Sequence, residues 1–543
     1  MVRVSVAEPT RGTPVKDGLF VLEQDRWDDY GYKTQYHLHY FGGETDTFIG
    51  NVKILRRGQG TTVSNILPPG PLLPLGEDFC SVGQSLDYYE RLASLAPELR
   101  DEILLFLRDV LSDPEHGKQF EVEEGWRVSL LREIDIDSYR PLAMTLLQRD
   151  YNALPSVGLA LRFQVTGWTA PLDLDFAAPE DEYSSFGLRR KAMRLPERIA
   201  VLIGRNGSGK STLLARLARV LHASQGSRNR EELTRLGRIE PPGIGFTRVI
   251  TIAYSAFDTF QIPGIDEQER RQMISDLKDG TGRYIFAGLR DIARELEERL
   301  APETYPDEMI DPGALDRQTR TYLKPAEQLG DEYARMVQSV FAQDRQALMF
   351  KMAAILLADP SFSDIPEQSP AALFELDPKQ TFMGWSTGHK IVMHALVTLV
   401  AYAQPKSIVL VDEPESHLHP PLLAALMHAI RAVLEEYDAF AVVATHSPVV
   451  AQETLGRHVS LVNRVGDEVT IVSPRIETYG ESIGEVTDEL FGLHAGATDF
   501  HTTLRAMVDG GLDLARIAAQ FDRGMSLQAR AYVMSLIASK DAV

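Results

Sequence analysis

The segment that most constrains this chain is an apolar strand followed directly by a glycine-rich loop and a helix. Ile199–Ile203 is entirely apolar, Gly204–Ser211 reads GRNGSGKS, and Thr212–Val220 has the composition of a helix. The loop fits the pattern G-x-x-x-x-G-K-[ST] at every fixed position, in the strand-to-helix context that such a loop requires. We therefore expect an α/β domain with a nucleotide phosphate bound at the end of this strand.

Each part of the loop has a predicted role. Glycines let backbone N–H groups wrap around phosphate oxygens, and the start of the helix adds partial positive charge. Lys210 is predicted to reach the β- and γ-phosphates as a catalytic residue, and the Ser211 hydroxyl to ligate Mg²⁺. The predicted nucleotide-binding residues of this segment are Gly204, Arg205, Asn206, Gly207, Ser208, Gly209, Lys210, Ser211 and Thr212.

A second apolar run, Ser407–Val411, ends in Asp412 and Glu413. Buried parallel strands read as continuous apolar runs, and ligands of such sheets bind at the carboxyl ends of the strands. Asp412 is predicted to hold Mg²⁺, directly or through water, and Glu413 to activate the attacking water as general base. A strand that merely ends in acidic turn residues is the simpler alternative, and the glycine-rich loop argues against it.

A third buried strand, Phe440–Thr445, ends at His446. The intervening helix Leu422–Tyr437 makes this one βαβ step, so His446 is expected beside Glu413. A histidine at this place could hydrogen-bond the γ-phosphate and respond to its loss. A strand-end histidine without a role is the alternative interpretation.

A short loop, Trp385–His389, precedes the predicted helix Lys390–Tyr402 and the Asp412 strand. It resembles the signature loop of ABC ATPases, although His389 replaces the usual Gln or Glu and Trp385 the usual Leu. In that family the loop faces the γ-phosphate held by the other subunit. The resemblance therefore implies that Ser386 and Gly388 bind nucleotide across a dimer interface, where a helix N-terminus favours anionic oxygen.

The order of the four motifs resembles that of ABC ATPases over residues 160–475. The resemblance implies ATP and Mg²⁺ as cofactors, ATP hydrolysis to ADP and phosphate, and a homodimer or higher even oligomer. Family members usually carry a Gln at the end of the strand that follows the glycine-rich loop. Here Asp258 and Gln261 follow the strand Val249–Tyr254, and both remain open for this role. The source of adenine recognition is also open.

The run Asp412–Pro420, DEPESHLHP, resembles soluble ABC ATPases of bacterial antiphage defence and their DNA-repair relatives. His417 and His419 within it are assigned to the dimer interface rather than to a metal. The segment Glu477–Gly484 resembles Septu-type defence ATPases, which act with a separate HNH nuclease. The chain also resembles OLD-type proteins, but we expect no Toprim nuclease of the kind that they carry: Asp-x-Asp does not occur after Pro448, and Asp509 and Asp513 flank a Gly-Gly turn.

The predicted organisation has three parts. Residues 1–155 form an extra N-terminal α+β region of unknown role, 156–475 an ABC-type ATPase head, and 476–543 a helical C-terminal tail. Within the head, about 260–375 is expected to be a compact helical insertion, since its charged stretches lack a sustained heptad repeat. In the N-terminal region His37 and His39 share a strand face without a third ligand, so a polar face is favoured over a metal site.

The net charge and the composition limit the kinds of binding partner that we expect. The net charge of −21 disfavours generic nucleic-acid binding. Two basic clusters are candidate contacts for DNA or RNA, although solvated surface is the simpler explanation. The single cysteine, Cys80, excludes an intramolecular disulfide, and neither a signal peptide nor a membrane span is recognised, so we expect a cytoplasmic protein without membrane contact. The clusters are Arg189, Arg190, Lys191 and Arg194, then Arg228, Arg230, Arg235 and Arg238.

Three functional hypotheses follow. The favoured one is a soluble ATPase that dimerises around ATP and gates a partner effector, plausibly a nuclease in antiphage defence. The second is a DNA-repair or chromosome-associated ATPase that binds DNA directly, and the third a transporter ATPase subunit. A neighbouring nuclease gene would favour the first, and salt-dependent DNA binding the second.

Overall fold

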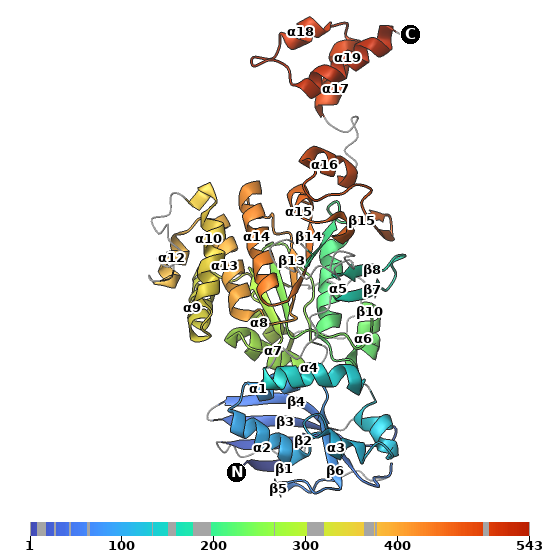
Figure 1. The fold of residues 1–543 in the computed structure, drawn as a ribbon, viewed down its shortest axis with the longest axis vertical. Helices are drawn as coiled ribbons and strands as arrows, with labels where there is room; N and C mark the ends of the chain where they lie inside the picture. Colours follow the sequence, from blue (N-terminus) through green and yellow to red (C-terminus); the bar gives the residue numbers. More distant parts are fainter. Residues whose placement is uncertain are drawn as a thin grey trace, which may run out of the picture.

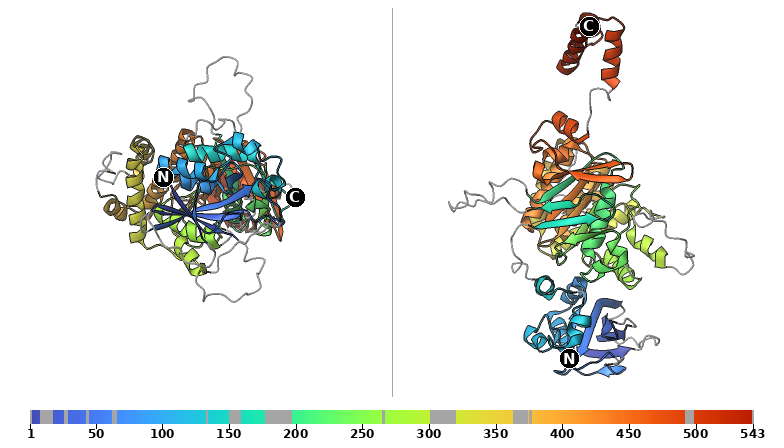
Figure 2. Two further views of the ribbon diagram at one scale, coloured as in Figure 1. Left: turned by 90° about the horizontal axis from the view of Figure 1, so that it is seen from below. Right: turned by 90° about the vertical axis from the view of Figure 1, so that its right-hand side faces the viewer.

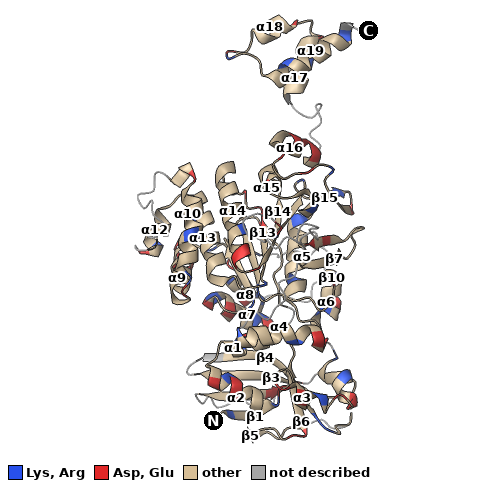
Figure 3. Cartoon of the chain, in the orientation of Figure 1, with Lys and Arg blue, Asp and Glu red and all other residues tan. Residues whose placement is uncertain are grey.

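The computed structural model of the chain shows an N-terminal unit, a larger α/β unit and a small C-terminal helical unit, arranged along its long axis (Figure 1, Figure 2). Lys and Arg are interspersed with Asp and Glu in all three (Figure 3). Among the helices of the described residues, none combines the length and apolar character needed to cross a bilayer. The structure describes residues 2–541 except 8–17, 26–28, 43–44, 62–65, 133, 150–158, 177–196, 265–266, 301–319, 363–373, 375–376 and 492–498.

The N-terminal unit is built on a six-stranded sheet in the order β5-β1-β2-β3-β4-β6. β1 and β2 are parallel, and the other neighbours are antiparallel. The predicted shared strand face of His37 and His39 appears in β3, where both are half-buried and the alternate residues Tyr36 and Leu38 are fully buried. The strands are β1 (Arg3–Ala7), β2 (Leu19–Gln24), β3 (Gln35–Gly42), β4 (Thr45–Arg56), β5 (Gly70–Leu72) and β6 (Phe79–Gly83).

Helices complete the hydrophobic core of this unit together with the sheet. The α+β character predicted for residues 1–155 is therefore present in its described part, and the predicted boundary itself falls in 150–158, outside the described residues. The helices are α1 (Leu86–Ala93), α2 (Pro97–Leu107), α3 (Pro114–Lys118), the π-helix η1 (Trp126–Leu130) and α4 (Ile136–Gln148).

The α/β unit contains a seven-stranded sheet in the order β12-β11-β13-β14-β9-β15-β16. All neighbouring strands are parallel except β15 and β16. A second, three-stranded antiparallel sheet has the order β10-β7-β8. The strands are β7 (Ala160–Val165), β8 (Leu172–Asp175), β9 (Ile199–Ile203), β10 (Gly237–Glu240), β11 (Val249–Ala253), β12 (Tyr284–Gly288), β13 (Ile408–Asp412), β14 (Phe440–Thr445), β15 (Val459–Val465) and β16 (Glu468–Val472).

Successive residues of β9 face two different hydrophobic cores. Val201 and Ile203 pack in a core with α13 and α14, whereas Ala200 and Leu202 pack in a core with α5. Both faces of the sheet are therefore covered, which explains the continuous apolar strands. The helices along this part are α5 (Lys210–His222), η5 (Ser227–Asn229), α6 (Glu231–Thr234), α13 (Thr387–Tyr402), α14 (Pro420–Glu436), α15 (Pro448–Gln452) and η8 (Gly456–His458).

The region predicted as a purely helical insertion, about 260–375, also contains a strand. β12 is a fully buried edge strand of the central sheet, paired in parallel with β11. The helical interpretation was wrong here because Tyr284–Gly288 is a short apolar run between two charged helices, too short for its period to be read. The helices are α7 (Glu267–Asp279), α8 (Ile292–Leu300), α9 (Ala326–Ala342), α10 (Gln346–Leu357), η7 (Pro360–Phe362) and α12 (Pro378–Gly384).

The C-terminal segment divides into two parts. Val486 and Leu490 of α16 (Ile483–Phe491) belong to the core of the α/β unit, so this helix is not part of a separate tail. The remaining helices α17 (Asp499–Asp509), α18 (Leu514–Ala518) and α19 (Leu527–Asp541) share a small core of their own. The described part of 476–543 is thus helical, but only the segment from α17 onward is separate from the α/β unit.

Buried ion pairs join the N-terminal unit to the α/β unit. Arg283 donates to Asp87 at 2.9 Å and to the carbonyl oxygen of Phe246 at 2.9 Å, with its side chain 2% exposed. Burial alone would raise the pKa of Asp87, but Arg283 and His222 lower it below its ordinary value. Breaking such a pair strands a buried charge, so this contact fixes the two units together.

Candidate functional site

The glycine-rich loop packs closely against neighbouring segments of the chain. A Cβ atom on Gly204 would lie 2.2 Å from the carbonyl oxygen of Val462. Gly209 has φ +101, in the left-handed region, and a Cβ there would lie 3.2 Å from the ring of Trp168. Only glycine meets both demands without moving its neighbours. The fixed glycines of the sequence pattern thus have a steric cause in this fold.

Lys210 and Ser211 begin α5, directly after the loop. The Lys210 amine donates to the carbonyl oxygens of Gly204 and Arg205 at 2.9 and 3.2 Å, and burial lowers its pKa although nearby carboxylates oppose this. Ser211 Oγ donates to Asp412 Oδ1 at 3.0 Å. The structure therefore brings together the two residues predicted to hold Mg²⁺.

Asp412 lies in a strongly acidic setting at the end of β13. Burial, with the charges of Asp258 and Glu413, raises the pKa of Asp412 to about 8. Burial also raises the pKa of Asp258 to about 6, with a further contribution from Glu413 and an opposing one from Arg290. Of the two residues left open after the Val249–Tyr254 strand, Asp258 is therefore the one whose charge acts on Asp412.

Glu413 adopts a backbone conformation that is unusual for a side chain with a Cβ. Its φ is +46, and its amide donates to the Ala444 carbonyl oxygen at 2.8 Å, next to the end of β14. Strain of this kind persists where the surrounding structure enforces it, commonly at functional sites. Glu413 Oε1 lies 3.8 Å from His446 Nδ1. The prediction that His446 lies beside Glu413 is therefore confirmed.

Glu415 was missed by the sequence reasoning. Its Oε1 accepts from Thr445 Oγ1 at 2.7 Å and from the His446 amide at 2.6 Å, and it lies 2.9 Å from His446 Nδ1. Its side chain is only 10% exposed, and its charge also acts on Lys210. Glu415 thus fixes the position of His446. The sequence feature that could have identified Glu415 was its position as the second glutamate of Asp-Glu-Pro-Glu.

Ser386 and Gly388 lie at the start of α13, which begins at Thr387, three residues before the predicted start. Ser386 Oγ accepts from the His389 amide at 3.4 Å as the N-cap of this helix. Gly388 lies beside the His417 carbonyl oxygen, 3.2 Å from the position of a Cβ. Since α13 and α5 cover opposite faces of the sheet, this loop is not on the side of the chain's own α5.

Two further residues near the loop were not identified from the sequence. The ring of Trp168 lies against Gly209, as does the guanidinium of Arg464. The signal for Trp168 was an aromatic residue in the turn between two strands that precede the loop. Arg205, predicted to bind nucleotide, donates instead to the Phe491 carbonyl oxygen at the end of α16 at 2.7 Å.

The remaining candidate residues from the sequence are the histidines of β3, the histidines that precede α14, and Gln261. His37 Nδ1 lies 2.6 Å from Asn51 Oδ1 and its Nε2 3.6 Å from Asp25. His419 caps α14 by accepting from the Leu422 amide at 3.3 Å, and His417 has φ +68. Gln261 lies just beyond the Asp258 loop, and nothing in the structure assigns it a role.

Only the second of the two predicted basic clusters lies in the described part of the chain. Arg189, Arg190, Lys191 and Arg194 lie outside the described residues. In the second cluster Arg228 is half-buried and donates to the carbonyl oxygens of Val220, Leu221, Pro242 and Ile244, and desolvation of its guanidinium lowers its pKa to about 10. Arg235 pairs with Glu231. This cluster therefore does not present four free cations to a nucleic acid.

The residues at this sheet edge fit a magnesium–nucleotide complex. Ser208 Oγ is buried and has no hydrogen-bond partner within the described part of the chain, as expected of a group that awaits a phosphate oxygen. The Lys210 amine can transfer its donors from loop carbonyls to phosphates, and Ser211 and Asp412 offer hard oxygen ligands of the kind Mg²⁺ prefers.

Comparison with known proteins supports this interpretation. Residues 199–451 match the family described as "AAA domain, putative AbiEii toxin, Type IV TA system". The chain is 29% identical over 549 residues to Protein ea59 of Escherichia phage lambda, covering 100% of this chain and 99% of that protein. A solved structure, "An inward-facing conformation of a putative metal-chelate type ABC transporter", shares 13% identity and covers 62% of this chain and 89% of its own, but its TM-score of 0.27 supports no further conclusion.

The family match extends from the first residue of β9 to α15 and includes every predicted site residue. It describes an AAA domain, whereas the order of the motifs resembles ABC ATPases; the finer Septu-type and OLD-related resemblances remain predictions. The site geometry and the family match lead to the same conclusion: this chain contains a P-loop ATPase domain.

Proposed function

We propose that this protein hydrolyses ATP in composite sites formed by two copies of the chain and uses the ATP-dependent closure of the dimer to gate a separate effector protein. The observation that carries the proposal is the position of Ser386 and Gly388. They lie at the start of α13, on the sheet face opposite α5. A helix N-terminus that binds phosphate there would serve the nucleotide of a second copy.

The chain's own groups divide the work of hydrolysis. Lys210 and the loop amides would bind the phosphates, and Ser211 with Asp412 would hold the metal. Bound Mg²⁺ would neutralise charge that develops on the phosphate oxygens. Glu413 accepts the proton of the attacking water, and its backbone is held in the left-handed region at φ +46. Glu415 holds His446 beside Glu413.

A nuclease of antiphage defence is the effector that we propose. The matching family's description names a toxin of a type IV toxin–antitoxin system, and the full-length relative is encoded by a phage. Both are compatible with a role in conflict between phages and bacteria. Affinity purification from the native host followed by mass spectrometry is expected to recover a nuclease in the ATP-bound state. Salt-dependent DNA binding by the protein alone would favour the rival DNA-repair function instead.

The composite site is tested by mixing two inactive variants. Ser386→Arg places a bulky cation where the partner's γ-phosphate must approach, so ATP affinity should persist while hydrolysis and dimer closure are lost. Lys210→Ala removes phosphate binding. Because Lys210 of one chain and Ser386 of the other belong to the same site, a heterodimer has one doubly damaged and one intact site. The mixture is expected to regain ATPase activity that neither variant has alone.

A matched control keeps the test specific. Ser526 is also an exposed helix N-cap, accepting from the Ala529 amide at 3.3 Å on α19, far from the ATPase motifs in sequence. Ser526→Arg should leave hydrolysis unchanged. Full activity of the Ser386→Arg protein would refute the composite site.

A further inference from the structure

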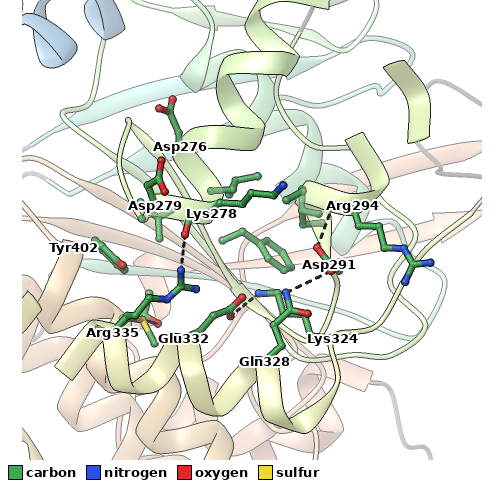
Figure 4. Close-up of a pocket in the computed structure, with 18 of the residues that line it drawn as sticks. Asp276, Lys278, Asp279, Asp291, Arg294, Lys324, Gln328, Glu332, Arg335 and Tyr402 are labelled. Carbon is green, nitrogen blue, oxygen red and sulfur yellow. Dashed lines mark hydrogen bonds and ion pairs between the residues drawn. The ribbon is translucent and has the colours of Figure 1, made fainter. Parts of the chain in front are cut away.

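A cavity of about 450 Å³ lies between the edge strand β12 with α7 and α8 on one side and α9 with α13 on the other (Figure 4). Its volume is in the range of small-molecule binding sites. The cavity is separate from the glycine-rich loop: none of the residues that line it belongs to that loop or to the ends of β13 and β14.

The charged groups of the cavity largely satisfy one another. Lys324 donates to Glu332 at 2.8 Å, and Lys278 pairs with Glu297. Arg335 points to the Lys278 carbonyl oxygen, to which it donates at 2.8 Å (Figure 4). A ligand with a net charge therefore gains little here, because each opposite charge already has a partner or is solvated at the rim.

The inner wall is apolar. Ile285 and Phe286 of β12, Ile292 of α8 and Met336 of α9 are all less than a tenth exposed and line the cavity. An apolar body of a ligand would displace water from these side chains, which is the main source of affinity in such sites.

One buried donor in the cavity wall has no acceptor. His394 of α13 is 2% exposed, and its Nδ1 lies 2.8 Å from the hydroxyl of Tyr254. A buried phenol must donate, and this nitrogen is the partner at hand, so Nδ1 accepts and the ring proton resides on Nε2. Burial lowers the pKa of His394 to about 3, which keeps the ring neutral. Within the described part of the chain Nε2 has no hydrogen-bond partner.

The nearest carboxylate defines what would satisfy this donor. Glu332 Oε2 lies 3.8 Å from His394 Nε2, too far for a direct hydrogen bond. One oxygen atom between them can be about 2.8 Å from each. A hydroxyl oxygen fits both neighbours, because it accepts from the imidazole N–H and donates to the carboxylate. A carbonyl oxygen could only accept from the imidazole, and an ammonium group could only donate to the carboxylate.

We propose that this cavity binds a small uncharged molecule with an apolar body and one hydroxyl group, an alcohol or a phenol, whose oxygen bridges His394 and Glu332. The site connects two parts of the ATPase domain. Tyr254 immediately precedes the loop that carries Asp258, and His394 lies on the helix that Ser386 caps. Binding as such does not rest on the proposed function, and it is measured without reference to ATP hydrolysis.

The test compares p-cresol with toluene, which has the same ring and methyl group but lacks the hydroxyl. Ligand-observed NMR titration of the full-length protein should show p-cresol binding at least about fivefold more tightly than toluene, the value of one net hydrogen bond. His394→Leu should remove this preference, while His428→Leu, an exposed histidine on α14, should leave it intact.

A second variant keeps the proposal testable if His394→Leu fails to fold. Ser339→Trp, at a half-buried position of α9 that lines the cavity, should fill the space and abolish binding of both compounds. Equal affinity for p-cresol and toluene would overturn the proposal. So would p-cresol binding that persists in Ser339→Trp, or a crystal structure grown with p-cresol in which only water bridges His394 and Glu332.

Discussion

Replacing Asp412 by Asn should stabilise the nucleotide-free protein at neutral and alkaline pH, although it removes a predicted metal ligand. Asp412 is 6% exposed, and burial together with Asp258 and Glu413 disfavours its ionised form. Asn has the same shape as the neutral acid and never acquires the charge. The single hydrogen bond from Ser211, at 3.0 Å, can be kept with the amide oxygen.

The magnitude follows from the raised pKa. The pKa of Asp412 is about 8 in the folded protein against 3.8 for an unperturbed group. Because the folded-state pKa lies above the unfolded one, this group's contribution to stability is fully present below about pH 4 and is lost as the pH rises toward 8. At about 1.4 kcal/mol per pKa unit, the loss between pH 5.5 and 8.5 is about 3 kcal/mol. The Asn variant lacks this loss.

The assay is thermal unfolding of the wild-type and Asp412→Asn proteins in EDTA without nucleotide, from pH 5.5 to 8.5. We expect the variant's midpoint to rise relative to the wild type by roughly 3–4 °C across this range, as the unfolding entropy of a chain of this length implies. Asp467→Asn, an exposed position in the turn between β15 and β16, is the control and should follow the wild type. Added Mg²⁺ and ATP should favour the wild type, since only it keeps the metal ligand. Parallel pH profiles of Asp412→Asn and wild type would refute the reasoning.

Three further substitutions test the site directly. Lys210→Ala should weaken ATP binding severely in a fluorescent-nucleotide titration, and unchanged affinity would exclude this loop as the site. Glu413→Gln should retain ATP binding but slow hydrolysis by roughly 10²-fold or more, as expected for loss of a general base, with a turnover assay as the check. Glu415→Gln keeps an acceptor for the backbone of His446 but loses the negative charge beside its imidazole; we expect hydrolysis to fall by roughly tenfold with little change in ATP affinity, and no effect on turnover would mean that His446 needs no such support.

Much of the site could be predicted because parallel strands bring their carboxyl ends to one edge. Asp412, Glu413 and His446 each follow a continuous apolar run, and that pattern alone put them beside one another. β12 was not predicted because Tyr284–Gly288 is too short to show the hydrophobic periodicity of a strand. Its pairing with β11 becomes apparent only in the folded structure. Strand pairing joins residues that are far apart in the sequence, so the composition of a short segment cannot predict it.

Glu415 escaped for a different reason. A glutamate two residues beyond Glu413 could equally face solvent, and its role depends on the turn after β13. That turn brings Glu415 to the end of β14, where it accepts hydrogen bonds from Thr445 and His446. Positive φ at Glu413 and at His417 produces the turn, and neither conformation is signalled by a glycine. Local rules therefore fail here because the surrounding structure enforces what the sequence does not favour.

The same sheet edge concentrates the energetic costs of the α/β unit. Glu413 has left-handed φ, Asp412 is buried among carboxylates that raise its pKa to about 8, and Ser208 and Glu415 have buried oxygens without partners in the described part of the chain. A bound cation would offset the charge of the buried carboxylates, and a phosphate oxygen would give Ser208 a partner. Such an arrangement makes the empty site less stable than the filled one, so nucleotide binding contributes stability in addition to affinity. A chain selected only to fold would not place a buried acid beside two other carboxylates at the end of its central strand, and this local conflict is the physical argument that the edge evolved to bind a ligand.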